Sequence, residues 1–125
     1  MERIPVHIVT GAPGSGKTAL ISRLCRERQD WFGLANALPG NAGAGLRLLS
    51  AGCPCCTGRV VLQISLARGL RETHATRAFV EIPGHGHAET LGKLLGEQPF
   101  SLSVYCSRSI VLPGDAGLQV TDLVA

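Results

Sequence analysis

A glycine-rich run, GAPGSGKT, constrains the fold of this chain more than any other feature. It occupies Gly11 to Thr18 and fits the pattern G-x-x-x-x-G-K-S/T. A β-branched run at 4–10 precedes it and indicates a buried strand, and a helix is predicted from Lys17 to about Arg28. Glycines let backbone amides close around a phosphate, and the helix N-terminus adds its positive dipole. The run therefore predicts a phosphate-binding loop.

The side chains of this loop have distinct predicted roles. Lys17 is expected to reach the β- and γ-phosphates of a nucleotide, and the Thr18 hydroxyl is expected to bind Mg²⁺. The chain has only two lysines and one of them occupies the required position, which argues against a chance glycine-rich turn. The residues predicted to bind the nucleotide in this loop are Gly11, Gly14, Ser15, Gly16, Lys17 and Thr18.

Strand-like and helix-like segments alternate along the rest of the chain. Strands are predicted at 31–35, 77–82 and 101–106, and helices at 58–70 and 88–96. This alternation predicts an α/β fold with a mostly parallel sheet. The 125 residues are expected to form one domain, in which 107–125 contributes one more strand and a poorly defined tail.

Two finer predictions concern segments between the strands. The segment 38–45, rich in glycine, proline and asparagine, is predicted to be an irregular loop. The helix at 58–70 is predicted to present Val60, Ile64, Ala67 and Leu70 on one face, which we expect to be its buried face.

Composition and charge exclude several classes of protein. Hydrophobic residues make up 45% and charged residues 17%, which is typical of a globular protein. The formal charge of +3 is mild and aromatic residues are scarce, so we expect no nucleic-acid binding. The apolar runs are shorter than the roughly 20 residues of a membrane span, and no secretory signal is visible. We therefore expect a cytoplasmic location and no membrane partner.

Three of the five cysteines lie close together in SAGCPCCTGR, at Cys53, Cys55 and Cys56. An odd number of cysteines in a reducing compartment argues against a disulfide framework. Three thiols on a tight loop can converge on a cation such as Zn²⁺. A redox pair of Cys53 with Cys56, or small apolar fillers, are the alternatives. Cys25 and Cys106 are predicted to be buried packing residues.

Three motifs, in order, give the chain its resemblance to the CobW-type P-loop GTPases, which are metallochaperones related to UreG and HypB. They are GAPGSGKT, GCPCC and EIPG, the last at Glu81 to Gly84, and the resemblance covers about residues 4–106. It implies a three-layer P-loop NTPase domain that binds GTP and Mg²⁺. It also implies that Zn²⁺, Co²⁺ or another divalent ion binds at the three clustered cysteines.

The resemblance also implies roles for individual residues. Glu81 would be the acidic residue of the third GTPase motif, so that Lys17, Thr18 and Glu81 form the catalytic set. Gly84 would contact the γ-phosphate and move on hydrolysis. His85 and His87 follow where the family is usually apolar, and they either form a solvated turn or complete the cysteine site.

The sequence departs from the family at several positions. Asn36 matches the asparagine of the first switch, but the following ALPG supplies no carboxylate. The Asn-Lys-x-Asp motif that selects guanine is absent from the sequence. The smaller C-terminal metal-handling domain of the family is missing as well. We therefore expect the chain to correspond to the first part of a CobW-type protein.

These observations favour one function and leave alternatives. The leading hypothesis is a GTPase of low turnover that couples hydrolysis to the binding and delivery of Zn²⁺ or a similar ion. The alternatives are a non-hydrolysing metal-binding module and an ATP-using P-loop protein with structural cysteines. The expected partner is a client metalloprotein or a complementing C-terminal half, and a homodimer is a further expectation.

Overall fold

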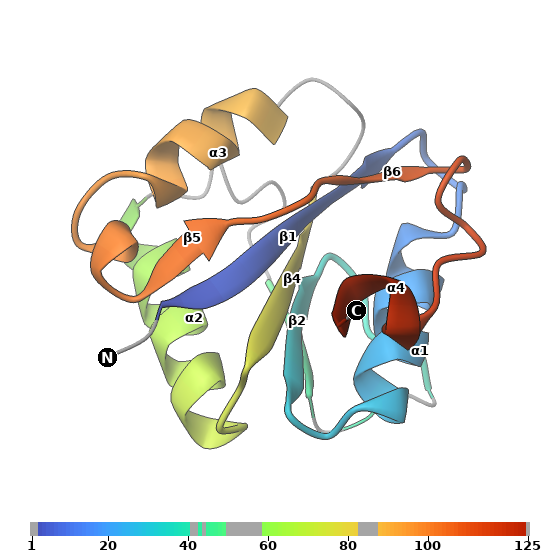
Figure 1. Ribbon diagram of the computed structural model, residues 1–125, viewed down its shortest axis with the longest axis horizontal. Coiled ribbons are helices and arrows are strands. Elements are labelled where there is room, and N and C mark those ends of the chain that lie inside the picture. Colours follow the sequence, from blue (N-terminus) through green and yellow to red (C-terminus); the bar gives the residue numbers. More distant parts are fainter. Residues whose placement is uncertain (1–2, 41–42, 44, 50–58, 83–87, 125) are drawn as a thin grey trace.

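A mostly parallel sheet forms the centre of the molecule and carries helices on both faces (Figure 1). The computed structural model describes residues 3–40, 43, 45–49, 59–82 and 88–124. Five of the six strands lie in the order β3-β2-β4-β1-β5. The sixth, β6, also pairs with β1, at residues 9–11, whereas β5 pairs with residues 4–6 of the same strand. The strand pairs have parallel register throughout. The predicted three-layer α/β architecture is confirmed.

The predicted order of elements recurs in the structure with small shifts at their ends. The elements are β1 (Ile4–Gly11), α1 (Lys17–Glu27), β2 (Trp31–Ala35), β3 (Leu46–Leu48), α2 (Arg59–Glu72), β4 (Arg77–Glu81), α3 (Ala88–Leu95), the 3-10 helix η1 (Phe100–Leu102), β5 (Val104–Cys106), β6 (Ile110–Leu112) and α4 (Val120–Val124). In the described part of the chain, no helix is long and apolar enough to cross a membrane.

Side chains of the central strand β1 point alternately to the two faces and so divide the core in two. Val6 and Ile8 join the cluster beneath α2 and α3, whereas Val9 joins the cluster beneath α1. The first cluster is centred on Phe32 and the second on Trp31 and Phe79, all of them buried. Aliphatic residues from the helices fill the space around these few aromatic rings.

The predicted buried face of α2 is right at Leu70 but wrong at Ile64 and Ala67. Ile64 is 51% exposed and Ala67 is exposed, whereas Leu62, Leu66 and Leu70 are buried against the sheet. The side chain of Val60 lies outside the described residues. Both sets of residues recur at helical spacing, so periodicity alone could not choose between them. The leucine row is the one that packs around Phe32 in the core.

The prediction of one strand over 101–106 is only half right. Its first part belongs to η1, where the backbone N–H groups of Leu102 and Ser103 donate to the carbonyls of Pro99 and Phe100. The ring of Phe100 is buried there, and the strand β5 begins only at Val104. The short strand β3, next to the predicted loop at 38–45, was not predicted, because three residues carry too little pattern.

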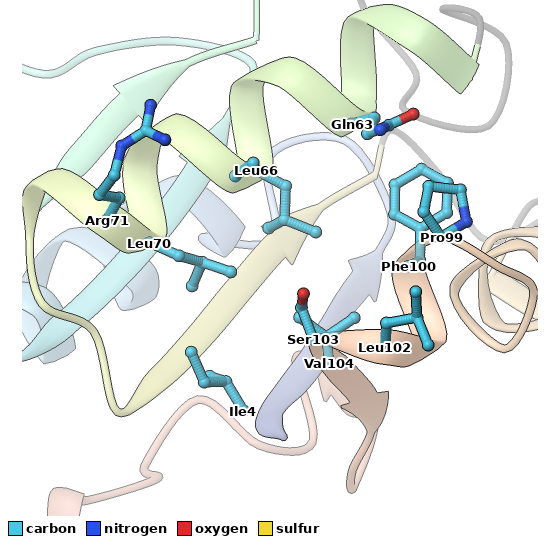
Figure 2. A pocket seen from close by; sticks show the side chains of 11 residues that line it. Ile4, Gln63, Leu66, Leu70, Arg71, Pro99, Phe100, Leu102, Ser103 and Val104 are labelled. Atoms are coloured by element: carbon cyan, nitrogen blue, oxygen red, sulfur yellow. The ribbon is translucent and has the colours of Figure 1, made fainter. Parts of the chain in front are cut away.

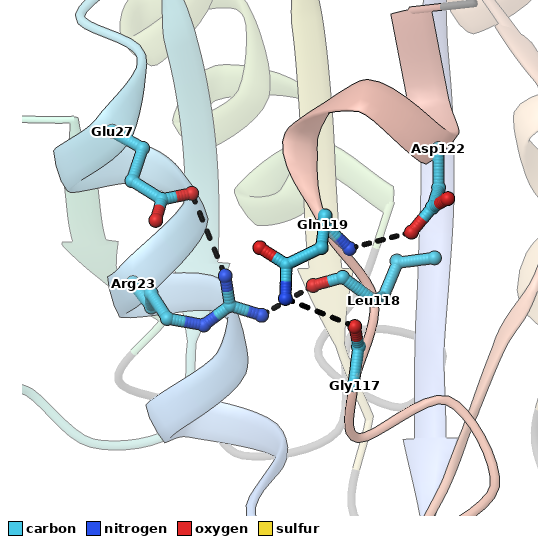
Figure 3. A network of polar contacts seen from close by, with 6 residues as sticks. All are labelled: Arg23, Glu27, Gly117, Leu118, Gln119 and Asp122. Atoms are coloured by element: carbon cyan, nitrogen blue, oxygen red, sulfur yellow. Dashed lines mark hydrogen bonds and ion pairs between the residues drawn. The ribbon is translucent and has the colours of Figure 1, made fainter.

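The C-terminal segment 107–124 is more ordered than a tail. It contains β6 and the short helix α4, which lies beside α1 (Figures 1 and 3). Arg23 of α1 donates a hydrogen bond to the carbonyl of Leu118, whose side chain is buried. The Asp122 carboxylate accepts a hydrogen bond from the Gln119 backbone N–H at 2.7 Å and so caps α4. The chain after β6 is thereby attached to the helix that follows the glycine-rich loop.

Candidate functional site

The glycine-rich loop connects the end of β1 to the start of α1, as predicted. Gly11 has φ of 151°, and a Cβ atom there would lie 2.8 Å from both the Leu112 carbonyl oxygen and Ser15 Oγ. Gly16 precedes the helix with φ of 95° in the left-handed region. Side chains would be strained at both positions, so the glycines are required by the backbone path itself. A turn bond from the Ser15 N–H to the Ala12 carbonyl closes the loop.

The ammonium group of Lys17 lies over the backbone of its own loop. Its Nζ atom donates to the carbonyl oxygens of Gly11, at 2.8 Å, and Ala12, at 3.2 Å, and the residue is only 6% exposed. Among the described residues no carboxylate forms an ion pair with it. A buried cation whose partners are neutral carbonyls favours an anionic ligand, because such a ligand would compensate its charge.

Glu81 stands at the centre of the site, where β4 ends between β1 and β2. Its Oε1 atom accepts a hydrogen bond from Thr18 Oγ1 at 2.6 Å and another from the Asn36 backbone N–H at 3.3 Å. The residue is 6% exposed. The carboxyl ends of three neighbouring parallel strands thus bring together a carboxylate, a hydroxyl and the backbone that follows β2.

The residues of this edge fit a nucleotide with Mg²⁺. The Thr18 hydroxyl and the Glu81 carboxylate are oxygen donors of the kind that Mg²⁺ prefers. The Ser15 hydroxyl oxygen is buried and has no hydrogen-bond partner in the described part of the protein. An orphaned buried hydroxyl is unfavourable, and a phosphate oxygen in the loop would satisfy it. Of the residues predicted from the sequence, the structure therefore brings together Lys17, Thr18 and Glu81.

The predicted metal ligands Cys53, Cys55 and Cys56 lie outside the described residues, as do Gly84, His85 and His87. Over the ranges that are described, no group of three histidine, cysteine or acidic residues could hold a metal ion. Two described strands precede these two groups of residues in the sequence. The parallel strands β3 and β4, which precede them, both end at the edge that carries Thr18 and Glu81.

The two remaining cysteines have different environments. Cys25 is buried as predicted, and burial raises the pKa of its thiol to about 12. The prediction that Cys106 is buried is wrong, because it lies exposed on β5, at the margin of the sheet. Cys25 packs in the core cluster beneath α1 and Cys106 lies on β5, and neither forms a contact with Lys17, Thr18 or Glu81 among the described hydrogen bonds and ion pairs.

No sequence motif signals two further features of the structure. The Asn36 contact with Glu81 is made by the backbone, which no motif reports. An apolar groove of about 470 Å³ lies between α2 and the η1–β5 segment, lined among others by Leu66, Leu70, Phe100 and Leu102 (Figure 2). Ile4, at the start of β1, also lines it, whereas the glycine-rich loop follows the end of that strand. The groove is therefore distinct from the nucleotide site.

Comparison with known proteins agrees with this geometry. Residues 5–112 match the family described as CobW/HypB/UreG, nucleotide-binding domain. Among curated proteins, the chain is 32% identical over 101 residues to the zinc chaperone YeiR of Escherichia coli (strain K12). That match covers 71% of this chain and 31% of the relative, so the chain spans less than a third of the relative's length. No solved structure matches. The matched range contains the loop, Glu81 and the sheet that positions them, and the chain belongs to the CobW/HypB/UreG nucleotide-binding domain family.

Proposed function

We propose that this chain is the nucleotide-binding part of a metallochaperone. It binds GTP with Mg²⁺ at the glycine-rich loop, and Zn²⁺ or a similar divalent ion at Cys53, Cys55 and Cys56. The observation that carries the proposal is the Thr18–Glu81 hydrogen bond beside the buried Lys17. Family membership and the likeness to a zinc chaperone support it.

Several groups of the loop bind the triphosphate together. The Lys17 ammonium exchanges its two backbone carbonyl partners for phosphate oxygens, and the loop amides and the Ser15 hydroxyl donate to the same group. The Thr18 hydroxyl and the Glu81 carboxylate would hold Mg²⁺, which would supply positive charge to the phosphates. Turnover is slow, because ALPG after Asn36 provides no second carboxylate at the switch.

Glu81 also provides a route by which the nucleotide affects the metal site. One carboxylate oxygen holds both Thr18 and the backbone N–H of Asn36. Loss of the Thr18 hydrogen bond on nucleotide binding would change the hydrogen bonding of that oxygen, and with it the contact of Glu81 with the backbone after β2. The segment after β2 continues through β3 to the cysteines, so nucleotide binding and metal binding are coupled. In the cytoplasm, the coupled release delivers the ion to a client metalloprotein.

Calorimetry with GTP, ATP and Zn²⁺, singly and together, tests the proposal. GTP should change the Zn²⁺ affinity, and Zn²⁺ should change the GTP affinity by the same factor. Lys17→Ala should abolish nucleotide binding and spare Zn²⁺, whereas the Cys55→Ser/Cys56→Ser double variant should do the reverse. Loss of both ligands in both variants would indicate misfolding, which circular dichroism of each variant would detect.

A second candidate is a metal-binding module that does not hydrolyse nucleotide. The absence of a carboxylate directly after Asn36, in the segment ALPG, favours it. Zn²⁺ binding that is independent of any nucleotide would select this candidate. Tighter binding of ATP than of GTP, with transfer of a phosphoryl group, would instead select an ATP-using protein whose cysteines are structural.

A further inference from the structure

A row of side chains crosses the sheet at the end opposite the glycine-rich loop. Trp31 of β2 pairs in register with Arg77 of β4, and Pro5 of β1 pairs with Tyr105 of β5. Because Val6 pairs with Ala78, Pro5 lies beside Arg77 one position earlier. The four residues therefore form one row across four neighbouring strands. Side chains in one row share a face, here that of Trp31 and Phe79, which α1 and α4 cover elsewhere.

Three guanidinium groups lie on the two aromatic rings of this row. The Cζ atom of Arg3 is 5.5 Å from the centroid of the Tyr105 ring. The Cζ atoms of Arg28 and Arg77 are 5.1 and 5.5 Å from the Trp31 ring. These distances lie within the range of cation–π contacts. We call the surface formed by Arg3, Arg28, Arg77 and Tyr105 the arginine row, as distinct from the row of paired strand residues.

The positive charge of the arginine row is only partly compensated. Arg28 forms two hydrogen bonds of 2.9 Å with the Asp30 carboxylate. In the described part of the chain, Arg3 and Arg77 have no carboxylate within ion-pair distance. Arg3 is exposed, Arg77 is half-buried and Tyr105 is 40% exposed, so the cations are accessible to a partner.

Arg77 is held in place by a buried histidine. Its Nη1 donates to Nε2 of His7 at 2.7 Å, and Nδ1 of His7 donates to the carbonyl oxygen of Arg108 at 2.6 Å. His7 is therefore neutral with its proton on Nδ1, and it fixes one side of the guanidinium. The remaining N–H donors of Arg77 keep the planar fork that matches a carboxylate. A side chain fixed in this way loses little entropy when it binds.

We propose that the arginine row is a docking surface for an acidic peptide segment of a partner protein. Its uncompensated guanidiniums complement aspartate and glutamate carboxylates, and the exposed ring of Tyr105 offers flat apolar contact beside them. A nucleic acid would require a longer basic stripe than these few cations, which include Arg28, already paired with Asp30. The surface lies at the far end of the sheet from Glu81, so partner and nucleotide can bind together. This inference does not depend on the proposed function.

Fluorescence of Trp31 provides a direct measurement, because it is the only tryptophan of the chain and lies beneath two of the cations. The intact protein is titrated with an oligoglutamate peptide, an oligoglutamine peptide and an oligothymidine. Oligoglutamate should bind most tightly, and its affinity should fall as salt is added. An equal affinity for oligoglutamine, or a higher one for oligothymidine, would overturn the proposal.

Three variants locate the binding surface. Arg77→Gln should weaken oligoglutamate binding by about tenfold, since it removes one charge-assisted contact. Arg68→Gln removes the same charge from the exposed side of α2, which packs on the other face, and should leave the affinity unchanged. An equal loss in both variants would refute the assignment. Should Arg77→Gln fail to fold, Arg3→Gln decides, because Arg3 is exposed and, among the described residues, its contact is with the Tyr105 ring. Weaker binding by this variant supports the surface, and wild-type binding refutes it.

Discussion

A single added methyl group tests how α2 packs on the sheet. A Cβ atom at Gly69 would lie 2.0 Å from Cζ and 2.2 Å from Cε1 of Phe32. The Phe32 ring is fully buried and belongs to the cluster that also contains Leu66 and Leu70. The ring cannot move aside without displacing these neighbours, so Gly69→Ala must either shift the helix or strain the core.

Two opposing terms set the magnitude of this change. Replacing glycine by alanine inside a helix favours folding by about 1 kcal/mol. Overpacking a dense core typically costs about 1–3 kcal/mol, and a contact of 2.0 Å calls for the upper part of that range. We therefore expect Gly69→Ala to lower the free energy of unfolding by about 2 kcal/mol. For a domain of this size the melting temperature should fall by roughly 8 °C.

Gly92→Ala is the matched control, because it makes the same chemical change in α3. A Cβ atom there would lie 3.9 Å from Ile8 Cδ1 and 4.0 Å from Cys106 Sγ, which are ordinary contacts. This variant should gain up to about 1 kcal/mol. Urea unfolding of both variants and the wild type, with m-values compared, measures the difference. A Gly69→Ala variant as stable as the wild type would refute the close packing of Gly69 against the Phe32 ring.

Three further predictions concern the polar contacts and the thiols. Burial holds the pKa of His7 below 6.5, so near that pH the native state binds fewer protons than the unfolded state. The urea midpoint should therefore fall as the pH drops below about 6.5. A midpoint that stays constant through that range would contradict the buried neutral ring. Arg23→Ala removes the hydrogen bond to the Leu118 carbonyl, and amide hydrogen exchange in α4 should become faster while that in β1 is unchanged. Cys25→Ala should not alter the number of thiols that react in the native protein, because burial raises the pKa of Cys25 to about 12, whereas Cys106→Ala should lower that number by one.

Much of the fold was predictable because its determinants are local or follow from chain order. The glycines at 11 and 16 specify their own backbone conformations, so the loop can be read from eight contiguous residues. The meeting of Thr18 with Glu81, 63 residues apart, follows once the sheet is parallel, since neighbouring strands then end at one edge. Motif and topology together therefore locate this part of the candidate site.

Other features depend on packing that a single sequence does not encode visibly. Ile64 and Leu66 are equally apolar, and only the shape of the core around Phe32 decides which of them is buried. Cys106 has a strand-like neighbourhood, yet its exposure depends on β5 lying at the margin of the sheet. The contact of Arg77 with His7 arises from the register of β1 and β4, which is a tertiary property with no local pattern.

The glycine-rich loop itself is framed by residues almost at the other end of the chain. Leu112 of β6 pairs with Gly11, and its carbonyl oxygen occupies the space that a side chain at position 11 would need. After β6, the chain reaches α1 and is held there by Arg23. The strand before the loop and the helix after it are thus both attached to the segment 107–124. The conformation of the loop is consequently a property of the folded domain. The contacts made by Leu112 and Leu118 support the loop and α1 from outside the motif at 11–18.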